Sequence, residues 1–161
     1  MFAKYEVEQY PRRTRLIANA FDADWNYTKL SRLTKGDHVE FKRLKSKIYE
    51  HYERIKDIWL YEIGRGETPM IGWNDFTIFG KRTGIQDGTA IDTATFDRTF
   101  ILTNVNTHGL TNSSERNLQR YEFVEVLVRL ATIKYKDKLH LASSFADALE
   151  MLLEKDVYPH A

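Results

Sequence analysis

The chain has 161 residues, of which 29% are charged and 13% are aromatic. This composition excludes a disordered chain, and a domain of this length buries roughly 70% of its unfolded surface in one core. The absence of cysteine excludes disulfides, thiolate zinc sites and cysteine nucleophiles. No apolar run approaches the roughly 18 residues of a membrane span, and the start of the chain lacks the apolar core of a signal peptide, so we expect a cytoplasmic protein.

The formal net charge of +1 is spread unevenly along the chain. Residues 1–65 carry 14 Lys and Arg against 10 Asp and Glu, whereas residues 66–161 carry 10 against 13. A net charge of +4 beside one of −3 is too mild to predict nucleic-acid binding. It favours an encounter of the first part with an acidic partner.

Residues 1–10 show no clear period, so we expect an arm that precedes the first helix. Pro11 is a favourable first residue of a helix, and apolar residues follow it at helical spacing, at Leu16, Ile17, Ala20 and Phe21. We expect residues 1–35 to form this arm and a helical extension, ahead of one compact unit over residues 36–161.

Residues 22–28 alternate oxygen-bearing side chains, as the start of a calcium-binding loop does. Tyr27 stands where such a loop needs glycine, and Leu33 stands where a carboxylate closes the site. Both count against calcium binding by residues 22–33. The alternative is that an Asp of this segment caps a helix beside a buried Trp25.

The longest helix is predicted from Gly36-Asp37 to about residue 62. Its apolar residues recur at steps of three and four along one stripe, namely Phe41, Leu44, Ile48, Tyr52, Ile55 and Trp59. Four cationic residues lie mostly off this stripe: Lys42, Arg43, Lys45 and Lys47. They form either a solvated face or a docking surface for an acidic partner.

Two shorter helices follow. The first begins with Trp73, Phe76 and Phe79 and ends near Gly84, a residue type typical of helix ends. The second is capped by Asp92 or Thr93. Its inner face is expected to consist of Phe96, Phe100 and Ile101.

The last third of the chain predicts the centre of the core. Leu118–Tyr135 is apolar around most of its circumference, which is typical of a buried helix. Ser144 and Asp147 resemble a capping box that begins a final helix. That helix is expected to face the core with Phe145, Ala148, Leu149, Leu152 and Leu153.

One pattern occurs twice: an apolar residue, an acid four positions later, and a Phe directly after the acid. Ile71, Asp75 and Phe76 form the first copy, and the second copy is Leu118, Glu122 and Phe123. The pattern resembles the way an EF-hand loop leads into its second helix, where the acid closes the calcium site with two oxygens. EF-hands pair through the strands at the apolar position, so we expect Ile71 to pair with Leu118.

The first loop lacks calcium ligands. Counted back from Asp75, it places Gly64, Gly66 and Thr68 at the first three side-chain ligand positions. Pro69 takes the position that requires glycine. We therefore expect no tight calcium binding there.

The second loop allows two frames, and neither is complete. A frame that starts at Asn104 has the required glycine and ends on Glu115, but it lacks the apolar residue and the Phe. A frame that starts at Thr111 ends on Glu122 but puts Arg116 at the glycine position. We expect no calcium and no other cofactor. If the loop binds calcium weakly, the ligands are Asn104, Asn106 and either Glu115 or Glu122.

From about Gly66 to Pro159 the chain resembles degenerate EF-hand domains. Its second half is similar to the core of the tubulin polymerization-promoting protein family, in Thr83-Gly84-Ile85, in Ile91-Asp92 leading to Phe96 and Phe100, and in the helices over Phe123–Ala131 and Ala146–Leu153. It also resembles EF-hand-like modules of ciliary and flagellar proteins, in which a helical region with an Asp-Trp pair, here Asp24-Trp25, precedes the two loops.

The resemblance implies an all-α, EF-hand-like pair of helix-loop-helix units with an N-terminal helical extension and a short two-stranded β-bridge between the loops. It also implies a microtubule-associated or axonemal protein of the cytoskeleton, cilium or flagellum. Its partner would be tubulin or another cytoskeletal component. The EF-hand frame would then serve as structure and not as a calcium switch.

No pattern in the sequence indicates catalysis. The five histidines show no metal-ligand spacing such as H-E-x-x-H, and acid pairs such as Glu122 and Glu125 are not set apart from other helical acids. We therefore predict a non-enzymatic interaction or structural module. The alternative is a weak calcium-binding sensor or regulatory subunit.

Overall fold

The computed structural model describes residues 2–64, 69–104 and 116–160, with side chains from Arg12 onward. The chain is mostly helical, and its only sheet within these ranges has two short strands, as predicted. The elements in chain order are α1 (Phe2–Tyr27), α2 (Leu30–Leu33), α3 (His38–Ile63), β1 (Ile71–Gly72), α4 (Trp73–Thr83), α5 (Thr93–Thr103), β2 (Asn117–Leu118), α6 (Arg120–Ala131), the π-helical η1 (Thr132–Lys138), α7 (Phe145–Met151) and the π-helical η2 (Leu152–Val157).

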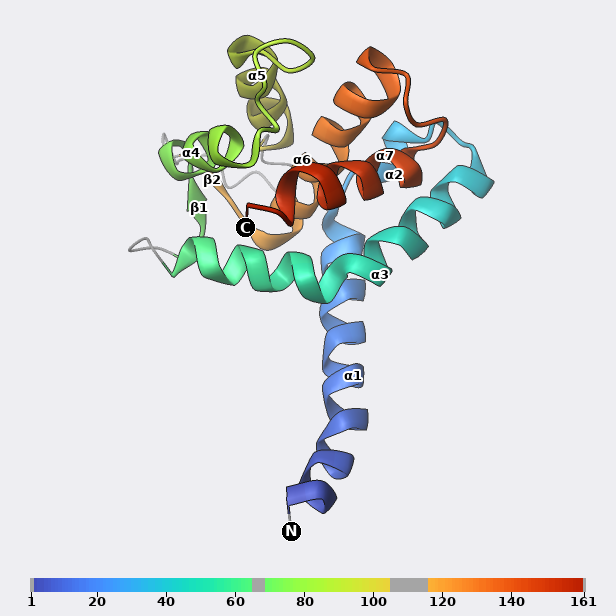
Figure 1. Ribbon diagram of the computed structural model, residues 1–161. Coiled ribbons are helices and arrows are strands. Elements are labelled where there is room, and N and C mark those ends of the chain that lie inside the picture. Colours follow the sequence, from blue (N-terminus) through green and yellow to red (C-terminus); the bar gives the residue numbers. More distant parts are fainter. Residues whose placement is uncertain (1, 65–68, 105–115, 161) are drawn as a thin grey trace.

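Helix α1 extends away from the body of the molecule, with the N-terminus at its far end (Figure 1). It begins at Phe2, so the prediction that Pro11 starts the first helix was wrong. That prediction used the preference of proline for a first turn, where its missing N–H is not needed. In α1 the helical backbone continues on both sides of Pro11. The boundary expected at residue 35 stays a prediction.

The end of α1 also corrects the interpretation of residues 22–33. Residues 22–27 belong to the helix and α2 follows almost at once, so this segment does not have the form of a calcium loop. Asp24 lies in the last two turns and does not cap a helix start, which contradicts that alternative. The predicted burial of Trp25 is confirmed.

Helix α3 follows the sequence closely, but it is not the longest helix as predicted, because α1 has the same 26 residues. The Asp37 carboxylate accepts hydrogen bonds from the backbone N–H groups of Val39 and Glu40, both at 3.1 Å, and so caps the helix. The predicted stripe is confirmed, because its members are buried except Phe41, which is partly buried. α3 therefore forms one wall of the core.

The two strands pair as predicted. Ile71 lies opposite Leu118 and Gly72 opposite Asn117 in an antiparallel register. Each strand leads directly into a helix, β1 into α4 and β2 through Gln119 into α6. The bridge therefore joins the starts of these two helices.

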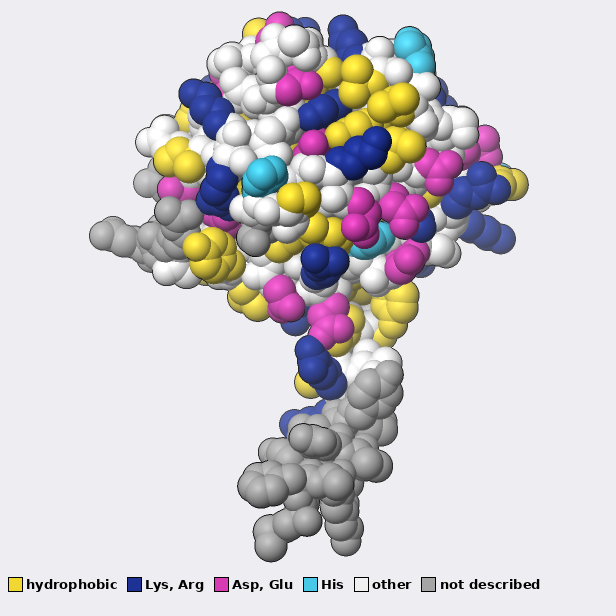
Figure 2. Space-filling model, in the orientation of Figure 1, with side chains coloured by type: hydrophobic (Ala, Val, Ile, Leu, Met, Phe, Trp, Pro, Cys, Tyr) yellow, Lys and Arg dark blue, Asp and Glu magenta, His cyan; other side chains and the backbone are white. Residues whose placement is uncertain are grey.

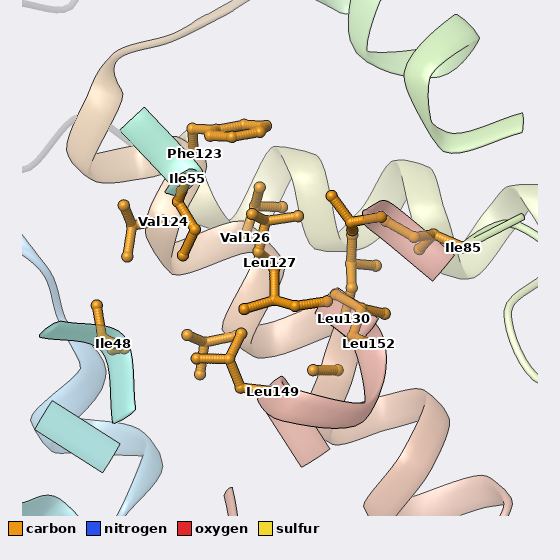
Figure 3. Close-up of a cluster of buried hydrophobic side chains, with 14 of the residues drawn as sticks. Ile48, Ile55, Ile85, Phe123, Val124, Val126, Leu127, Leu130, Leu149 and Leu152 are labelled. Carbon is orange, nitrogen blue, oxygen red and sulfur yellow. The ribbon is translucent and has the colours of Figure 1, made fainter. Parts of the chain in front are cut away.

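The core is built around α6, which is flanked by α3, α5 and α7. Figure 3 shows α6 side chains from Phe123 to Leu130 meeting Ile48 and Ile55 of α3 and Leu149 of α7. The helical region that begins with α6 runs beyond the predicted Tyr135, because π-helical turns continue it to Lys138. Leu118 and Gln119 precede the helix, because Leu118 is part of the bridge.

The helices beside α6 confirm most of the expected caps. Asp92 caps α5, Ser144 caps α7, and Gly84 ends α4 with a left-handed φ of 78°. α4 and α5 approach closely at Gly80, where a Cβ atom would collide with the Phe96 ring. The inner face of α5 includes Phe96 and Phe100 but not Ile101, which is 42% exposed and corrects the prediction.

The final helix confirms its predicted core face, because Ala148, Leu149, Leu152 and Leu153 are buried and Phe145 is partly buried. Among the described residues, no helix combines the length and the apolar character that crossing a membrane requires.

Candidate protein-binding surface

The structure brings together two of the residues proposed as weak calcium ligands. The Glu122 carboxylate is buried and accepts a hydrogen bond from the backbone N–H of Gln119 at 2.9 Å. Its second oxygen accepts one from the side-chain amide of Asn104 at 3.2 Å. The other two proposed ligands, Asn106 and Glu115, lie outside the described residues.

The hydrogen-bonded arrangement at Glu122 is not the geometry of a calcium site. Asn104 turns its Nδ2 toward Glu122 and donates a second hydrogen bond to the Asn117 carbonyl at 2.6 Å, whereas calcium binds oxygen. Burial raises the pKa of the Glu122 carboxyl, although these N–H donors lower it in part. The carboxylate therefore serves as a cap for the first turn of α6.

The acid of the first loop has a different environment. Asp75 is exposed in the first turn of α4, and its side chain makes no hydrogen bond or ion pair with a described residue. Gly66 and Thr68, two further residues of that loop, lie outside the described residues. The two loop ends thus share their apolar positions but not the surroundings of their acids.

The four cations predicted as a docking surface fall into three groups. Lys42 and Arg43 are exposed, and their side chains pair with no described residue. Lys45 is partly buried, with its ammonium 5.7 Å from the centre of the Trp25 ring. Lys47 points elsewhere, because its ammonium lies 3.1 Å from Glu50 and 3.3 Å from Glu150.

Two further cations join the first group. Arg32 of α2 and Lys35 of the following turn are exposed, and their side chains also pair with no described residue. Figure 2 shows Lys and Arg side chains gathered at the edge of the molecule where α3 begins. We name this surface the basic corner and define it as Arg32, Lys35, Lys42, Arg43 and Lys45. Arg32 and Lys35 were missed because they lie before the predicted helix, although residues 29–47 contain seven Lys and Arg against two acids.

A hollow of about 170 Å³ lies beside the basic corner, between the end of α1, α2 and the start of α3. Its walls are Trp25, Phe41, Asn26, Thr28 and Ser31. The Trp25 and Phe41 rings stand 5.1 Å apart at their centres. An aromatic wall beside unpaired cations suits an acidic peptide that carries an apolar side chain.

The best-formed buried charges are explained by structural pairing. Asp24 accepts hydrogen bonds from Arg120 at 2.6 Å and from the Tyr52 hydroxyl at 2.5 Å, which ties α1 to α6 and α3. Lys134 contacts Asp156 at 3.0 Å and the Gly84 carbonyl at 2.8 Å. Each pairing joins elements that are distant in sequence, so both are explained by the fold.

Comparisons of the chain with protein-family models, with curated proteins and with solved structures found no match. The interpretation of the basic corner therefore rests on its own geometry and charge.

Proposed function

We propose that this protein is a non-enzymatic interaction module with an EF-hand-like architecture, which docks an acidic segment of a partner protein at the basic corner. The observation that carries the proposal is the group of exposed cations Arg32, Lys35, Lys42 and Arg43, which pair with no described residue and belong to the same segments as a hollow lined by Trp25 and Phe41. Following the family resemblance, the proposed partner is tubulin or another component of the cytoskeleton, cilium or flagellum.

The state of these cations favours docking over a purely solvated face. Lys42, Arg43, Arg32 and Lys35 keep their charges without a partner among the described residues, so docking breaks no existing ion pair. Nearby Asp37 does not neutralise them by contact, since its carboxylate caps α3. The hollow adds two aromatic rings, Trp25 and Phe41, to an otherwise polar lining, which distinguishes the corner from a uniform basic surface.

The proposal assigns a structural role to the EF-hand-like frame. The paired strands and the engagement of both Glu122 oxygens by N–H donors support this role. A weak calcium sensor is the alternative, favoured by the proximity of Asn104 and Glu122. In that case calcium must turn the Asn104 amide around and displace two hydrogen bonds, and calorimetry with calcium would detect the binding.

Co-sedimentation with polymerised tubulin tests the proposal. We expect binding at low salt that weakens as salt increases, because the contact is electrostatic. The Lys42→Glu/Arg43→Glu variant should bind at least about tenfold more weakly. Lys81→Glu/Lys138→Glu is the matched control, since it changes the net charge equally at exposed positions of α4 and η1.

The identity of the partner and the location of the docking surface are tested by different outcomes. No co-sedimentation at low salt would refute tubulin as the partner. Binding that the Lys42→Glu/Arg43→Glu variant retains in full would refute the basic corner as the docking surface.

A further inference from the structure

A second group of polar side chains lies between α3 and α7, two helices in extensive contact. Glu50 and His51 are neighbours on α3, and Glu150 faces them from α7. One ligand atom from each residue can be chosen so that all three lie within 4.8 Å of one another. Among the described residues, this is the only such group of three or more acids and histidines.

His51 is the buried member of this group, and its ring has a fixed orientation. The residue is 8% exposed, and its Nδ1 lies 2.7 Å from the Tyr158 hydroxyl oxygen. Its Nε2 is buried without a hydrogen-bond partner and stands 3.9 Å from a Glu150 oxygen. When Nδ1 donates to Tyr158, the Nε2 lone pair faces a carboxylate, and a cation between the two atoms stabilises the arrangement.

The contact with Tyr158 matches the support that a metal-binding histidine receives. Such a histidine usually donates its other ring N–H to an oxygen, which fixes the tautomer and the orientation of the ring. The Arg54 guanidinium lies 3.6 Å from the centre of the Tyr158 ring and holds it in place.

Lys47 already supplies one positive charge here. Its ammonium contacts Oε2 of Glu50 and Oε2 of Glu150, while Oε1 of Glu150 is turned toward His51. The two carboxylates carry two negative charges, and the Lys47 ammonium balances one of them by direct contact. A dication therefore complements the group, and Lys47 limits how tightly it is held.

We propose that Glu50, His51 and Glu150 bind a divalent transition-metal ion, with Zn²⁺ as the best match, and that the ion pins α3 to α7. Zn²⁺ binds imidazole nitrogen and carboxylate oxygen at about 2.0–2.2 Å, which places ligand atoms about 3.3 Å apart around a tetrahedral ion. The side chains of Glu50 and Glu150 are 59% and 42% exposed, so they can rotate the short distance toward the fixed imidazole. An imidazole ligand disfavours Ca²⁺ and Mg²⁺.

This inference is independent of the basic corner, because neither the hollow nor the unpaired cations take part. The test is a calorimetric titration of the metal-free full chain with ZnCl₂, together with its thermal unfolding temperature. We expect one saturable equivalent of Zn²⁺ and a higher unfolding temperature with the ion bound, since it joins two helices.

Four variants locate the site. His51→Gln and Glu150→Gln should each weaken Zn²⁺ binding by at least about tenfold, because each removes a ligand. Lys47→Gln should tighten it, because a competing cation is lost. His38→Gln is the matched control on the same helix, where the histidine is exposed, and should leave binding unchanged.

Glu150→Gln is the decisive variant, because Glu150 is half-exposed and its replacement leaves the His51–Tyr158 contact in place. The absence of saturable Zn²⁺ binding would overturn the proposal. So would Zn²⁺ binding that survives Glu150→Gln in full, binding that weakens in Lys47→Gln, or equal affinity for Ca²⁺.

Discussion

The starts of α4 and α6 present the same sequence pattern in two different environments. Their apolar positions are equivalent: Ile71 and Leu118 pair across the bridge, and Phe76 and Phe123 are fully buried. Their acids are not equivalent. Asp75 lies on the surface, whereas Glu122 is buried and its carboxylate accepts hydrogen bonds from Asn104 and from the backbone N–H of Gln119.

This difference separates the apolar residues, which hold the two helix starts together, from the acids, which do not. The apolar positions carry the pairing, and they are kept in both copies. The acids are not needed for that pairing, so one can be solvated while the other caps a helix. Variants at the two sites should therefore give similar effects at the aromatic positions and different effects at the acids.

The largest effects are expected at the aromatic positions. Phe76→Ala and Phe123→Ala should each lower the free energy of unfolding by about 3–5 kcal/mol, because each empties a fully buried site. The two rings touch edge to face at 6.4 Å between centres, so the losses should not add in the double variant. Urea unfolding measures all three. If one variant lost several times more free energy of unfolding than the other, the two aromatic positions would not be equivalent.

A smaller effect is expected where α6 is tied to α1. Arg120→Met removes the cation that pairs with buried Asp24 and leaves only Tyr52 as its donor, so we expect a loss of about 3 kcal/mol. The Arg120→Met/Asp24→Asn double variant should be more stable than Arg120→Met alone, because no unpaired charge stays buried. Chemical unfolding at neutral pH measures both, and a double variant less stable than the single one would contradict this account.

The smallest effect concerns the acids themselves. Burial raises the folded-state pKa of Glu122 above its ordinary value of 4.5, so the folded protein binds this proton more readily than the unfolded chain. The stability contributed by protonation is complete below pH 4.5 and is lost as pH rises through the raised pKa. The free energy of unfolding of Glu122→Gln should therefore be lower than that of the wild type by about 1 kcal/mol near pH 4, and by less at neutral pH.

The matched control is Asp75→Asn, which should change the free energy of unfolding by less than about 0.5 kcal/mol because the side chain is exposed. Unfolding curves recorded at several pH values between about 4 and 7 compare the two variants. A difference between wild type and Glu122→Gln that grows as pH rises would show that the carboxylate is stabilised and not penalised by its surroundings.

Local signals in the sequence predicted much of this fold. The stripe of α3, its start after Gly36-Asp37, the glycine at the end of α4 and the Ser144 cap depend on neighbours within a few residues, and all four are confirmed. The start of α1 was missed because proline is a strong local signal that the helix nevertheless continues through. Ile101 was misplaced because packing decides which side of α5 is covered.

The candidate sites were less predictable, because they depend on residues that are far apart in sequence. Asp24 pairs with Arg120, which lies 96 residues later in the sequence, so no local pattern indicates this contact. The approach of Glu150 to His51 has no local pattern either. Lys42 and Arg43 were predicted for the docking surface, yet Lys47 left that group because Glu150 attracts it.

The central claim is that packing and hydrogen bonds, and not calcium, hold the two helix starts together. The most direct test is the thermal unfolding temperature of the metal-free protein with and without excess calcium. The account predicts the same temperature in both solutions. A saturable rise with calcium that Glu122→Gln abolishes would contradict it.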